Sequence, residues 1–572
     1  MRIKECLSIV AGIILTASVH SQVSFISPLK FPLSLSANFG ELRPDHYHSG
    51  IDLKTQGVTG KEVVASADGY VYLILVSPVG FGKAIYIRHP FGLSTVYAHL
   101  DNYSPEIEEY VKYQQYKNKT FAITITPPQE RLPVKKGQLI GYSGNTGGST
   151  GPHLHFEIRK SDGEKPLDPL KYDFEITDNL KPVIERLVVY PVSKSAIING
   201  SRGRTVFDVY GSNGNYSLTE GNDLYINGTA GFGISAFDNI NDMPSRFGIS
   251  SIELLIDSLP WFTYEINEFS FSETRFINAH IDYPARVRNN QEIEKTFVLP
   301  NDKLSLYRNY MNNGLYDFSD SKIHAVKIIV KDSYGNKSSL SFNVKPAAPA
   351  PASATNTTVD SSITVMPYGK ENIFSSEGIK LTIPAGSLYD TLHFKYKKVS
   401  LNGSLLSPVH EIHNKLSPLH KASRLSLKPD TIPAGKSSKL IIVVLDEKGN
   451  RTSQGGTFSG GLISADIRAF GSYAVSIDTV APVISLNGFT DGANLSEKGS
   501  IRIFITDNLS GIKSYNGTID GNWALFEYDA KNNLIFYNFD PRRITKGLTH
   551  KLELIVTDNC NNTSTLTRNF IW

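Results

Sequence analysis

Apolar positions in this chain of 572 residues form short runs rich in Val, Ile, Tyr and Phe, and Gly, Pro, Asn and Asp separate the runs. Five clear runs lie at residues 70–77, 83–89, 325–332, 439–446 and 552–558. Turn residues recur roughly every 8 to 12 positions, which is the spacing of short strands joined by tight turns. The pattern predicts a mainly β protein.

One stretch, residues 104–116, departs from this pattern. Ser104 is placed as an N-cap, Pro105 follows at the first helical position, and acidic residues fill the first turn. Four side chains fall at i, i+3, i+4 and i+7: Ile107, Tyr110, Val111 and Gln114. We predict a short helix here.

The chain is too long for one hydrophobic core, and about 150 residues per domain predicts three to five domains. Residues 345–358 are rich in Pro, Ala, Ser and Thr without periodicity, which indicates an extended linker. Short matches across this linker indicate two sandwich modules of one plan: 178–187 with 478–486, 234–239 with 503–512, and 328–339 with 554–564. Each match is a strand that runs into an Asp-Asn or Gly-Asn turn, so we interpret its aspartates as turn residues rather than calcium ligands.

The N-terminus predicts export. Arg2 and Lys4 precede an apolar run at residues 7–19, and Ser18 and Ser21 offer a cleavage site, as in a secretory signal peptide. No run has the roughly 20 apolar residues that a membrane-spanning helix needs. We expect an exported protein without a transmembrane segment, in the periplasm or cell envelope of a bacterium.

Cysteine and charge content add two further expectations. Of the two cysteines, Cys6 leaves with the signal peptide and only Cys560 remains, so no intrachain disulfide forms and stability comes from burial. The net charge of +3 arises from 58 basic and 55 acidic residues, which argues against a nucleic-acid partner.

Histidines concentrate in three short motifs: HYHSGIDL at 46–53, TVYAHL at 95–100 and GPHLHFEI at 151–158. Alternation along a strand places His153 and His155 on one face. A catalytic zinc site requires three nitrogen or oxygen ligands and a position for water, which a His/Asp/His set supplies. Further imidazoles, from His99 and one of the pair at 153 and 155, are suited to proton transfer.

These motifs, in this order, resemble the lysostaphin/LytM-type zinc metallopeptidases, whose pattern is H-x-x-x-D, a histidine in a strand, and H-x-H. The likeness covers about residues 30–172 and includes the strands and Gly-rich turns at 63–74, 134–159 and 166–172. It implies an N-terminal antiparallel β-sheet metallopeptidase domain followed by β-sandwich (Ig-like) modules. It also implies that His48, Asp52 and His155 hold Zn²⁺, while His99 and His153 face the attacking water and the scissile carbonyl.

The resemblance and the composition together predict the domain organisation of the whole chain. It comprises a signal peptide (1–21), a LytM-type zinc peptidase domain (22–174), an Ig-like β-sandwich (175–344), the linker (345–358), a β domain (359–477) and a second Ig-like β-sandwich (478–572).

The implied function is an exported zinc metalloendopeptidase that cuts peptidoglycan peptides, in the stem or the cross-bridge. Two alternatives stay open. The family also contains members that have lost ligands and activate other hydrolases, so a catalytically idle wall-binding module is one; a protease of other proteins or Gly-rich peptides is the second. The β-sandwich modules are expected to contact envelope partners.

Several neighbouring residues have secondary interpretations. We consider Asn38 and Arg43 for substrate carboxylate or carbonyl groups, His46 for an alternate ligand, and Tyr97 for an oxyanion donor. His89 is expected to be structural, and Glu157 is expected to orient a ligand or face solvent.

Two more segments bear on the site. An insertion at about 101–131 is expected to border the groove, as a cover or a surface elaboration. The histidines of VHEIHNK, at 409–415, lack the helical spacing of zinc proteases, so we assign no site there.

Overall fold

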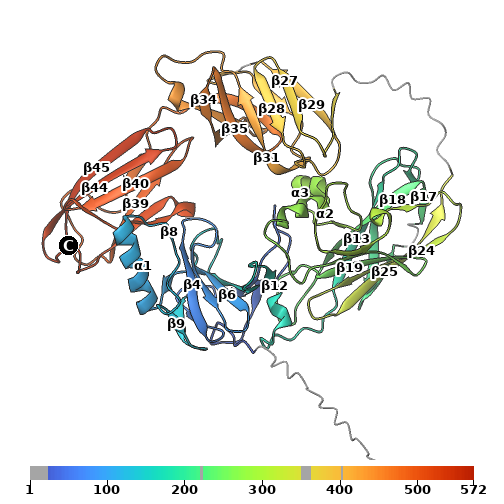
Figure 1. Ribbon diagram of the computed structural model, residues 1–572, viewed down its shortest axis with the longest axis horizontal. Coiled ribbons are helices and arrows are strands. Elements are labelled where there is room, and N and C mark those ends of the chain that lie inside the picture. The colour runs from blue at the N-terminus through green and yellow to red at the C-terminus, as the bar shows by residue number, and fades with distance from the viewer. Residues whose placement is uncertain (1–23, 220–222, 349–362, 401–402) are drawn as a thin grey trace, which may run out of the picture.

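The computed structural model describes residues 24–219, 223–348, 363–400 and 403–572. The predicted signal peptide and most of the predicted linker lie outside these ranges. Figure 1 shows four β-rich units arranged in a closed circuit, which we call the N-terminal unit (24–174), the second unit (175–348), the third unit (363–477) and the fourth unit (478–572). The predicted mainly β fold is confirmed. None of the helices that the structure describes has the length and apolar character to cross a membrane.

The N-terminal unit contains an antiparallel sheet with the order β1-β2-β11-β6-β5-β4-β8. In that order the strands are Leu35–Ala37, Ile51–Lys54, His153–Lys160, Leu93–Leu100, Lys83–Arg88, Gly69–Val76 and Ile123–Ile125. Strands β9 (Pro133–Val134) and β12 (Pro166–Leu167) pair with β4 and β11. A second sheet comprises β3 (Glu62–Val64), β10 (Leu139–Tyr142) and β7 (Asn102–Tyr103).

Both sheets contribute to one core, and this fixes which side chains of β11 face outward. Leu154, Phe156 and Ile158 are fully buried in that core. Because side chains alternate along a strand, His153, His155 and Glu157 lie on the opposite face of the sheet. Sequence alternation in β11 thus separates core residues from polar ones.

The predicted helix is confirmed as α1, Pro105–Asn118, with Ser104 at the N-cap. Its buried side chains are Ile107, Val111 and Gln115, so Gln115 rather than Gln114 completes the inner face. Gln115 Nε2 donates to Phe121 O at 2.7 Å, which ties the end of the helix to the chain leading into β8.

The second unit has a 13-stranded, mostly antiparallel sheet system. Its strands are β13 (Val183–Pro191), β14 (Ile197–Ile198), β15 (Thr205–Ser212), β16 (Asn215–Leu218), β17 (Leu224–Asn227), β18 (Thr229–Phe237), β19 (Ser251–Ile256), β20 (Leu259–Glu265), β21 (Glu294–Lys295), β22 (Tyr307–Tyr310), β23 (Tyr316–Asp317), β24 (His324–Lys331) and β25 (Lys337–Pro346). Two short helices, α2 (Ile277–His280) and α3 (Tyr283–Asn289), connect β20 to β21.

The third and fourth units each contain two sheets around one core. Strands of the third unit are β26 (Ile363–Met366), β27 (Asn372–Ser376), β28 (Ile379–Ile383), β29 (Leu392–Val399), β30 (Val409–Ile412), β31 (Pro418–Leu427), β32 (Leu440–Leu445), β33 (Arg451–Gly455), β34 (Thr457–Ser459), β35 (Leu462–Ala469) and β36 (Gly471–Ile477). Those of the fourth are β37 (Val483–Leu486), β38 (Ala493–Asn494), β39 (Ser500–Thr506), β40 (Ile512–Ile519), β41 (Asn522–Trp523), β42 (Glu527–Asp529), β43 (Leu534–Asn538), β44 (Thr549–Asp558) and β45 (Thr563–Ile571).

Side chains are exchanged across the junction of the first two units. Phe39, Leu42 and Tyr47 pack into the core of the second unit. In return, Ile240 and Phe247 pack into the core of the N-terminal unit. The segment that carries His48 is therefore anchored in two cores at once.

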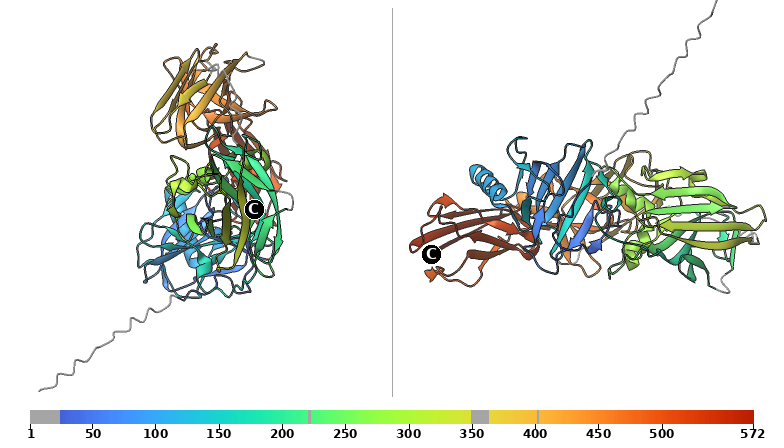
Figure 2. Two further views of the ribbon diagram at one scale, coloured as in Figure 1. Left: turned by 90° about the vertical axis from the view of Figure 1, so that its right-hand side faces the viewer. Right: turned by 90° about the horizontal axis from the view of Figure 1, so that it is seen from below.

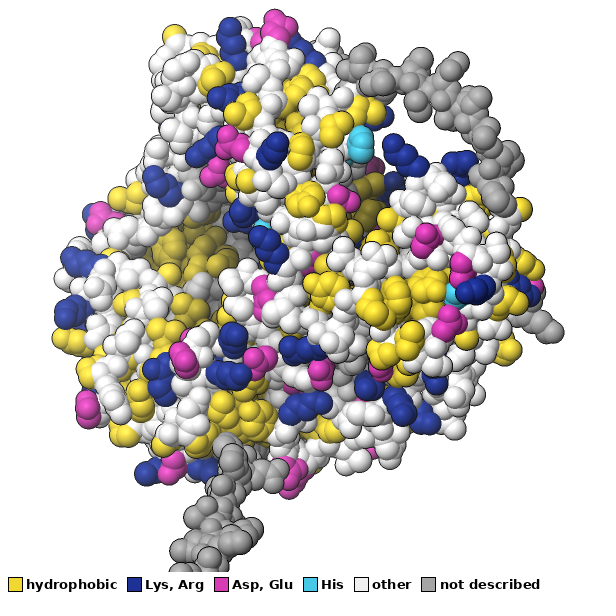
Figure 3. All heavy atoms as spheres, turned by 45° about the vertical axis from the view of Figure 1, so that its right-hand side comes forward, with side chains coloured by type: hydrophobic (Ala, Val, Ile, Leu, Met, Phe, Trp, Pro, Cys, Tyr) yellow, Lys and Arg dark blue, Asp and Glu magenta, His cyan; other side chains and the backbone are white. Residues whose placement is uncertain are grey.

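Polar contacts join the remaining units into the circuit. Asn301 Nδ2 of the second unit donates to Leu388 O of the third at 2.7 Å, and Lys439 Nζ of the third donates to Cys560 O of the fourth at 2.8 Å. The circuit closes where Lys83 Nζ lies 2.7 Å from Glu527 Oε2. Figure 2 shows the second and fourth units on opposite sides of the N-terminal unit, and the face in Figure 3 has charged side chains of both signs interspersed.

Candidate metal centre

Strand register brings Asp52 and His155 together. Strand β2 pairs antiparallel with β11, and Asp52 lies directly opposite His155. Directly paired side chains on one face have Cβ atoms about 4.5–5.5 Å apart. His155 Nδ1 lies 2.9 Å from Asp52 Oδ1.

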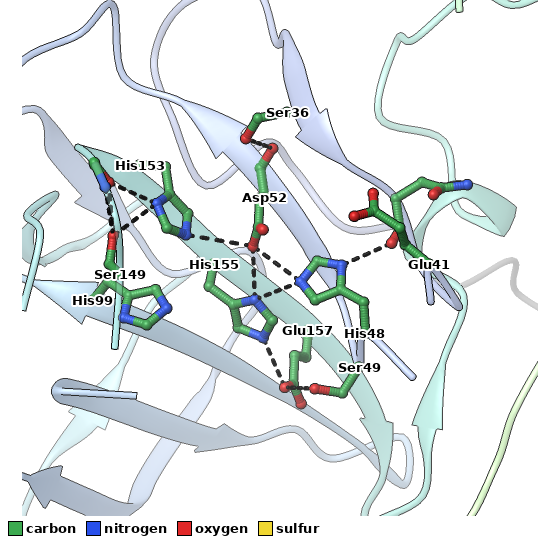
Figure 4. A network of polar contacts seen from close by, with 12 residues as sticks. Ser36, Glu41, His48, Ser49, Asp52, His99, Ser149, His153, His155 and Glu157 are labelled. Carbon is green, nitrogen blue, oxygen red and sulfur yellow. Dashed lines mark hydrogen bonds and ion pairs between the residues drawn. The ribbon is translucent and has the colours of Figure 1, made fainter. Parts of the chain in front are cut away.

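His48 reaches the same point from the loop before β2. That loop is closed by backbone hydrogen bonds from Gly40 N to His48 O and from His48 N to Glu41 O, each 2.9 Å. His48 Nε2 lies 3.1 Å from Asp52 Oδ1 and 3.1 Å from His155 Nδ1. In Figure 4 the three side chains point toward one another.

This donor set fits a zinc ion. Four ligands about 2.0–2.1 Å from zinc at tetrahedral angles are about 3.3 Å apart, close to the separations here. Two imidazole nitrogens and a carboxylate oxygen are also ligand types that zinc accepts.

The outer nitrogen of each imidazole is already engaged, which fixes the tautomers. His48 Nδ1 lies 2.7 Å from Asn38 O; since a carbonyl only accepts, Nδ1 carries the hydrogen and Nε2 keeps its lone pair. His155 Nε2 lies 2.8 Å from Glu157 Oε1, which leaves Nδ1 to face Asp52 and His48. Once His155 Nδ1 has lost its proton, a cation between it and His48 Nε2 would satisfy the lone pairs of both nitrogens.

Glu157 is the fully buried acceptor behind His155. It accepts from Ser49 Oγ at 2.6 Å and pairs with Arg159. Burial alone raises the pKa of Glu157, but the charges of Arg159 and His155 lower it to about 2. Of the two alternatives for Glu157, exposure to solvent is excluded, and its carboxylate instead holds the His155 ring.

His99 and His153 lie beside this cluster, with ring centroids 4.8 Å apart. His99 Nδ1 donates to Thr146 O at 2.9 Å, so Nε2 is the nitrogen left for chemistry. Burial, together with the neighbouring His155 and His153, lowers the pKa of His99 to about 3, which keeps the ring neutral at pH 7. His153 Nδ1 lies 2.9 Å from Gly151 O, and its Nε2 is 3.5 Å from Asp52 Oδ1.

The Gly-rich loop at 144–151 positions both imidazoles through Thr146 O and Gly151 O. Gly147 permits the close packing of this loop, because a Cβ there would lie 2.4 Å from Gly80 O. Lys531 of the fourth unit donates to Asn145 O and, at 2.8 Å, to Ser149 O. A cavity of about 410 Å³ lies beside the loop, between the N-terminal and fourth units.

Tyr97 is not an oxyanion donor. Its ring is fully buried in the core, and its hydroxyl group is engaged by Ser66 N at 2.8 Å and Thr95 Oγ1 at 3.0 Å. Regular alternation would place Tyr97 and His99, two residues apart, on one face of the strand. A register shift between β5 and β6 and the left-handed backbone of His99 (φ 58°) break the alternation.

The structure gives different outcomes for the other neighbouring residues that the sequence suggested. The side-chain amide of Asn38 donates to Gly248 O at 2.8 Å and accepts from Gly248 N at 2.9 Å. The interpretation of Asn38 as a substrate-binding residue was therefore wrong. Arg43 Nη2 lies 3.3 Å from Asp52 Oδ2 and thus faces the Asp52 carboxylate. His46 pairs with Asp45 outside the cluster, and His89 is structural as expected, bound to Asp68 O and Thr95.

Asp101, Asn102 and Phe121 of the insertion line the cavity beside the Gly-rich loop. Strand β8 lies at the far edge of the sheet from β2 and β11. Helix α1 instead contacts the fourth unit: Tyr116 packs edge-on against Trp523 with ring centroids 5.2 Å apart, and Arg543 lies 3.9 Å above the Tyr116 ring.

Three participants were missed: Ser49, Thr146 and Lys531. No sequence pattern marks them, because Thr146 acts through its backbone carbonyl, Ser49 reaches the site only through Glu157, and Lys531 is separated from Ser149 by 382 positions. Only the fold brings them to the site.

Comparisons with known families agree with this geometry. Residues 46–116 and 123–169 match the family described as Peptidase family M23, and residues 363–478 match a Zu5-like domain. The second match lies in the third unit.

Individual relatives match part of the chain. DD-carboxypeptidase/endopeptidase Mpg of Neisseria meningitidis is 36% identical over 123 residues, 22% of this chain and 22% of that protein. Murein hydrolase activator NlpD of Salmonella typhimurium is 32% identical over 158 residues, 27% of this chain and 34% of that protein. The solved catalytic domain of lysostaphin from Staphylococcus simulans has 25% identity over 24% of this chain and 90% of its own, with a TM-score of 0.19.

The chain spans about a fifth of the length of the first curated relatives it matches. The matched residues nevertheless contain all three histidine motifs. Residues 46–169 of this chain thus contain a LytM-type domain of peptidase family M23.

Proposed function

We propose that this protein is an exported zinc metalloendopeptidase that hydrolyses peptide bonds in peptidoglycan, in the stem peptide or the cross-bridge. The observation that carries the proposal is the convergence of His48, Asp52 and His155 on one point, with two further imidazoles beside it. The N-terminal signal pattern supports export, and the name of the relative Mpg supports a peptide substrate.

In this proposal His48 Nε2, Asp52 Oδ1 and His155 Nδ1 hold zinc. The chemistry that bound zinc supplies is Lewis acidity, which lowers the pKa of a water to about 7 and polarises a carbonyl. Asn38 O and Glu157 hold the two imidazoles in the tautomers that binding requires.

His99 and His153 manage protons. The neutral His99 ring offers Nε2 as a hydrogen-bond acceptor for the attacking water and guides the water's proton to the leaving amine nitrogen as the C–O bond forms and the C–N bond breaks. His153 provides a second imidazole for the carbonyl side. The open antiparallel sheet beside them suits an extended peptide without bulky side chains.

A second candidate function is activation of another hydrolase, which the similarity to NlpD favours. A catalytically idle module needs neither the metal ligands nor the paired imidazoles. Both are present in this chain.

Digestion of purified sacculi discriminates between the two functions. The zinc-loaded protein is expected to release peptide fragments, and a chelator is expected to stop the release. His99→Ala serves as the matched inactive variant because it leaves the three ligands intact. Failure to release fragments at any metal loading favours the activator, and preferential cleavage of Gly-rich peptides over muropeptides favours a protease of other substrates.

A further inference from the structure

Three aspartates meet at the end of the second unit that faces the N-terminal unit. Asp178 precedes β13, Asp238 follows β18 and Asp332 follows β24. One carboxylate oxygen from each lies within 4.8 Å of the other two. They belong to the repeated Asp-containing matches that the sequence led us to interpret as turns.

Turn formation accounts for only part of this cluster. Asp332 Oδ1 accepts from Tyr334 N and Asn336 N, both at 2.9 Å, as an aspartate in a turn does. Asp446 forms the same turn, accepting from Lys448 N and Asn450 N at 2.8 Å each, but is exposed and belongs to no such carboxylate group among the described residues.

Two oxygens of the cluster have no partner. Asp238 is 2% exposed, and its Oδ1 is buried without a hydrogen bond. Asp178 Oδ2 is likewise buried and unpartnered. A buried carboxylate without a partner is costly, and a bound cation removes that cost.

The cluster lies where the chain passes between units. Asn336 Nδ2 donates to Asp178 O at 3.3 Å, which ties the connecting segment to the turn after β24. The loop after Asp238 carries Ile240 and Phe247 into the core of the N-terminal unit. It ends at Gly248, the partner of Asn38.

A comparable arrangement recurs between the third and fourth units. Oxygens of Asp478, Asp507 and Asp558 lie within 4.8 Å of one another, and Asp507 Oδ1 is buried and unpartnered. Asn562 Nδ2 donates to Asp478 O at 3.1 Å, the counterpart of the bond from Asn336 to Asp178. The shared geometry follows the internal sequence matches.

We propose that Asp178, Asp238 and Asp332 bind a calcium ion that fastens the junction between the N-terminal and second units. Calcium takes six to eight oxygen ligands and accepts irregular geometry, whereas magnesium requires a regular octahedron and keeps most of its waters. A group of three carboxylates, two of them buried and the third partly exposed, with unpaired oxygens matches the calcium preference. An oxygen-only site also separates this cation from the imidazole-rich zinc centre.

Calorimetric titration of calcium chloride into the full-length protein tests the proposal. Asp238→Asn is expected to bind one calcium fewer than the wild type, or to weaken that site at least tenfold. Asp446→Asn is the matched control, since it alters the same turn without the carboxylate group. His155→Ala is expected to keep full calcium binding. The calcium result can therefore be interpreted even if the zinc proposal fails.

Absence of calcium binding in the wild type overturns the proposal, as does unchanged stoichiometry and affinity in Asp238→Asn. Asp178→Asn, at a partly exposed position, gives the same test if Asp238→Asn does not fold. A magnesium titration run in parallel is expected to show binding at least tenfold weaker than that of calcium.

Discussion

Replacement of Glu157 by Gln probes the support of the candidate metal centre without changing a proposed ligand. Glu157 accepts from His155 Nε2 and Ser49 Oγ and pairs with Arg159. Glutamine keeps the volume, but only one of its two terminal atoms can accept a hydrogen bond. The imidazole of His155 thereby loses its charged partner.

The expected effect is a loss of zinc affinity by about 10–100-fold, the usual consequence of removing a partner of a metal ligand. This corresponds to about 1.4–2.8 kcal/mol of binding free energy. The free energy of unfolding also falls, because the buried Arg159 loses the charge of Glu157 that it pairs with. The loss stays below the about 3–5 kcal/mol typical of a broken buried pair, since Glu164 Oε2 remains 3.7 Å from Arg159 Nη1.

Zinc affinity is measured by competition with a chromophoric chelator, and the free energy of unfolding by denaturant titration of the metal-free protein. Glu164→Gln is the matched control, because Glu164 pairs with the same arginine but contacts no ligand in the cluster. Wild-type zinc affinity in Glu157→Gln, or an equal loss in Glu164→Gln, refutes the reasoning.

Three further predictions concern turnover, positioning and pH. His99→Ala is expected to keep its zinc and to lose about 10²–10⁴-fold in kcat; retained turnover contradicts the assigned role. Lys531→Met removes the charge that holds two carbonyls of the Gly-rich loop and is expected to lower kcat several-fold at unchanged zinc content, whereas the exposed control Lys546→Met has no effect. Burial lowers the pKa of His155 and hydrogen bonds to two carboxylates raise it, to about 9 in balance. Zinc must displace the proton that His155 carries below this pKa. The affinity for zinc is therefore expected to rise by about tenfold per pH unit from pH 7 toward 9, and a zinc affinity that does not change with pH contradicts this.

The sequence predicted those features of the site that depend on local spacing. Alternation placed His153 and His155 on one face of β11, and the helix at 105–118 followed from its Pro and apolar spacing. The convergence of these histidines with Asp52 depends on strand register, which sequence spacing does not give. The family resemblance was the basis for predicting it.

Prediction failed where an irregular backbone or a contact between distant parts of the chain determines the position of a side chain. The left-handed conformation of His99 moved its side chain relative to Tyr97, and no periodic pattern encodes such a change. The contact from Lys531 and the exchange of Phe39 and Phe247 between cores arise only in the assembled chain.

The exchange between cores also bears on function. The loop that presents His48 is fixed by Tyr47, which packs in the second unit, and by Asn38, which binds Gly248. Lys531 fixes the Gly-rich loop from the other side of the circuit. The β units therefore brace both loops of the candidate metal centre.

X-ray absorption at the zinc edge of the full-length wild-type protein tests the central claim most directly. One zinc per chain is expected, with scattering from two imidazoles and light-atom ligands at about 2.0–2.1 Å, and this signal is expected to be lost in His155→Ala. A spectrum without imidazole scattering, or the same spectrum in His155→Ala, would mean that His48, Asp52 and His155 do not hold zinc.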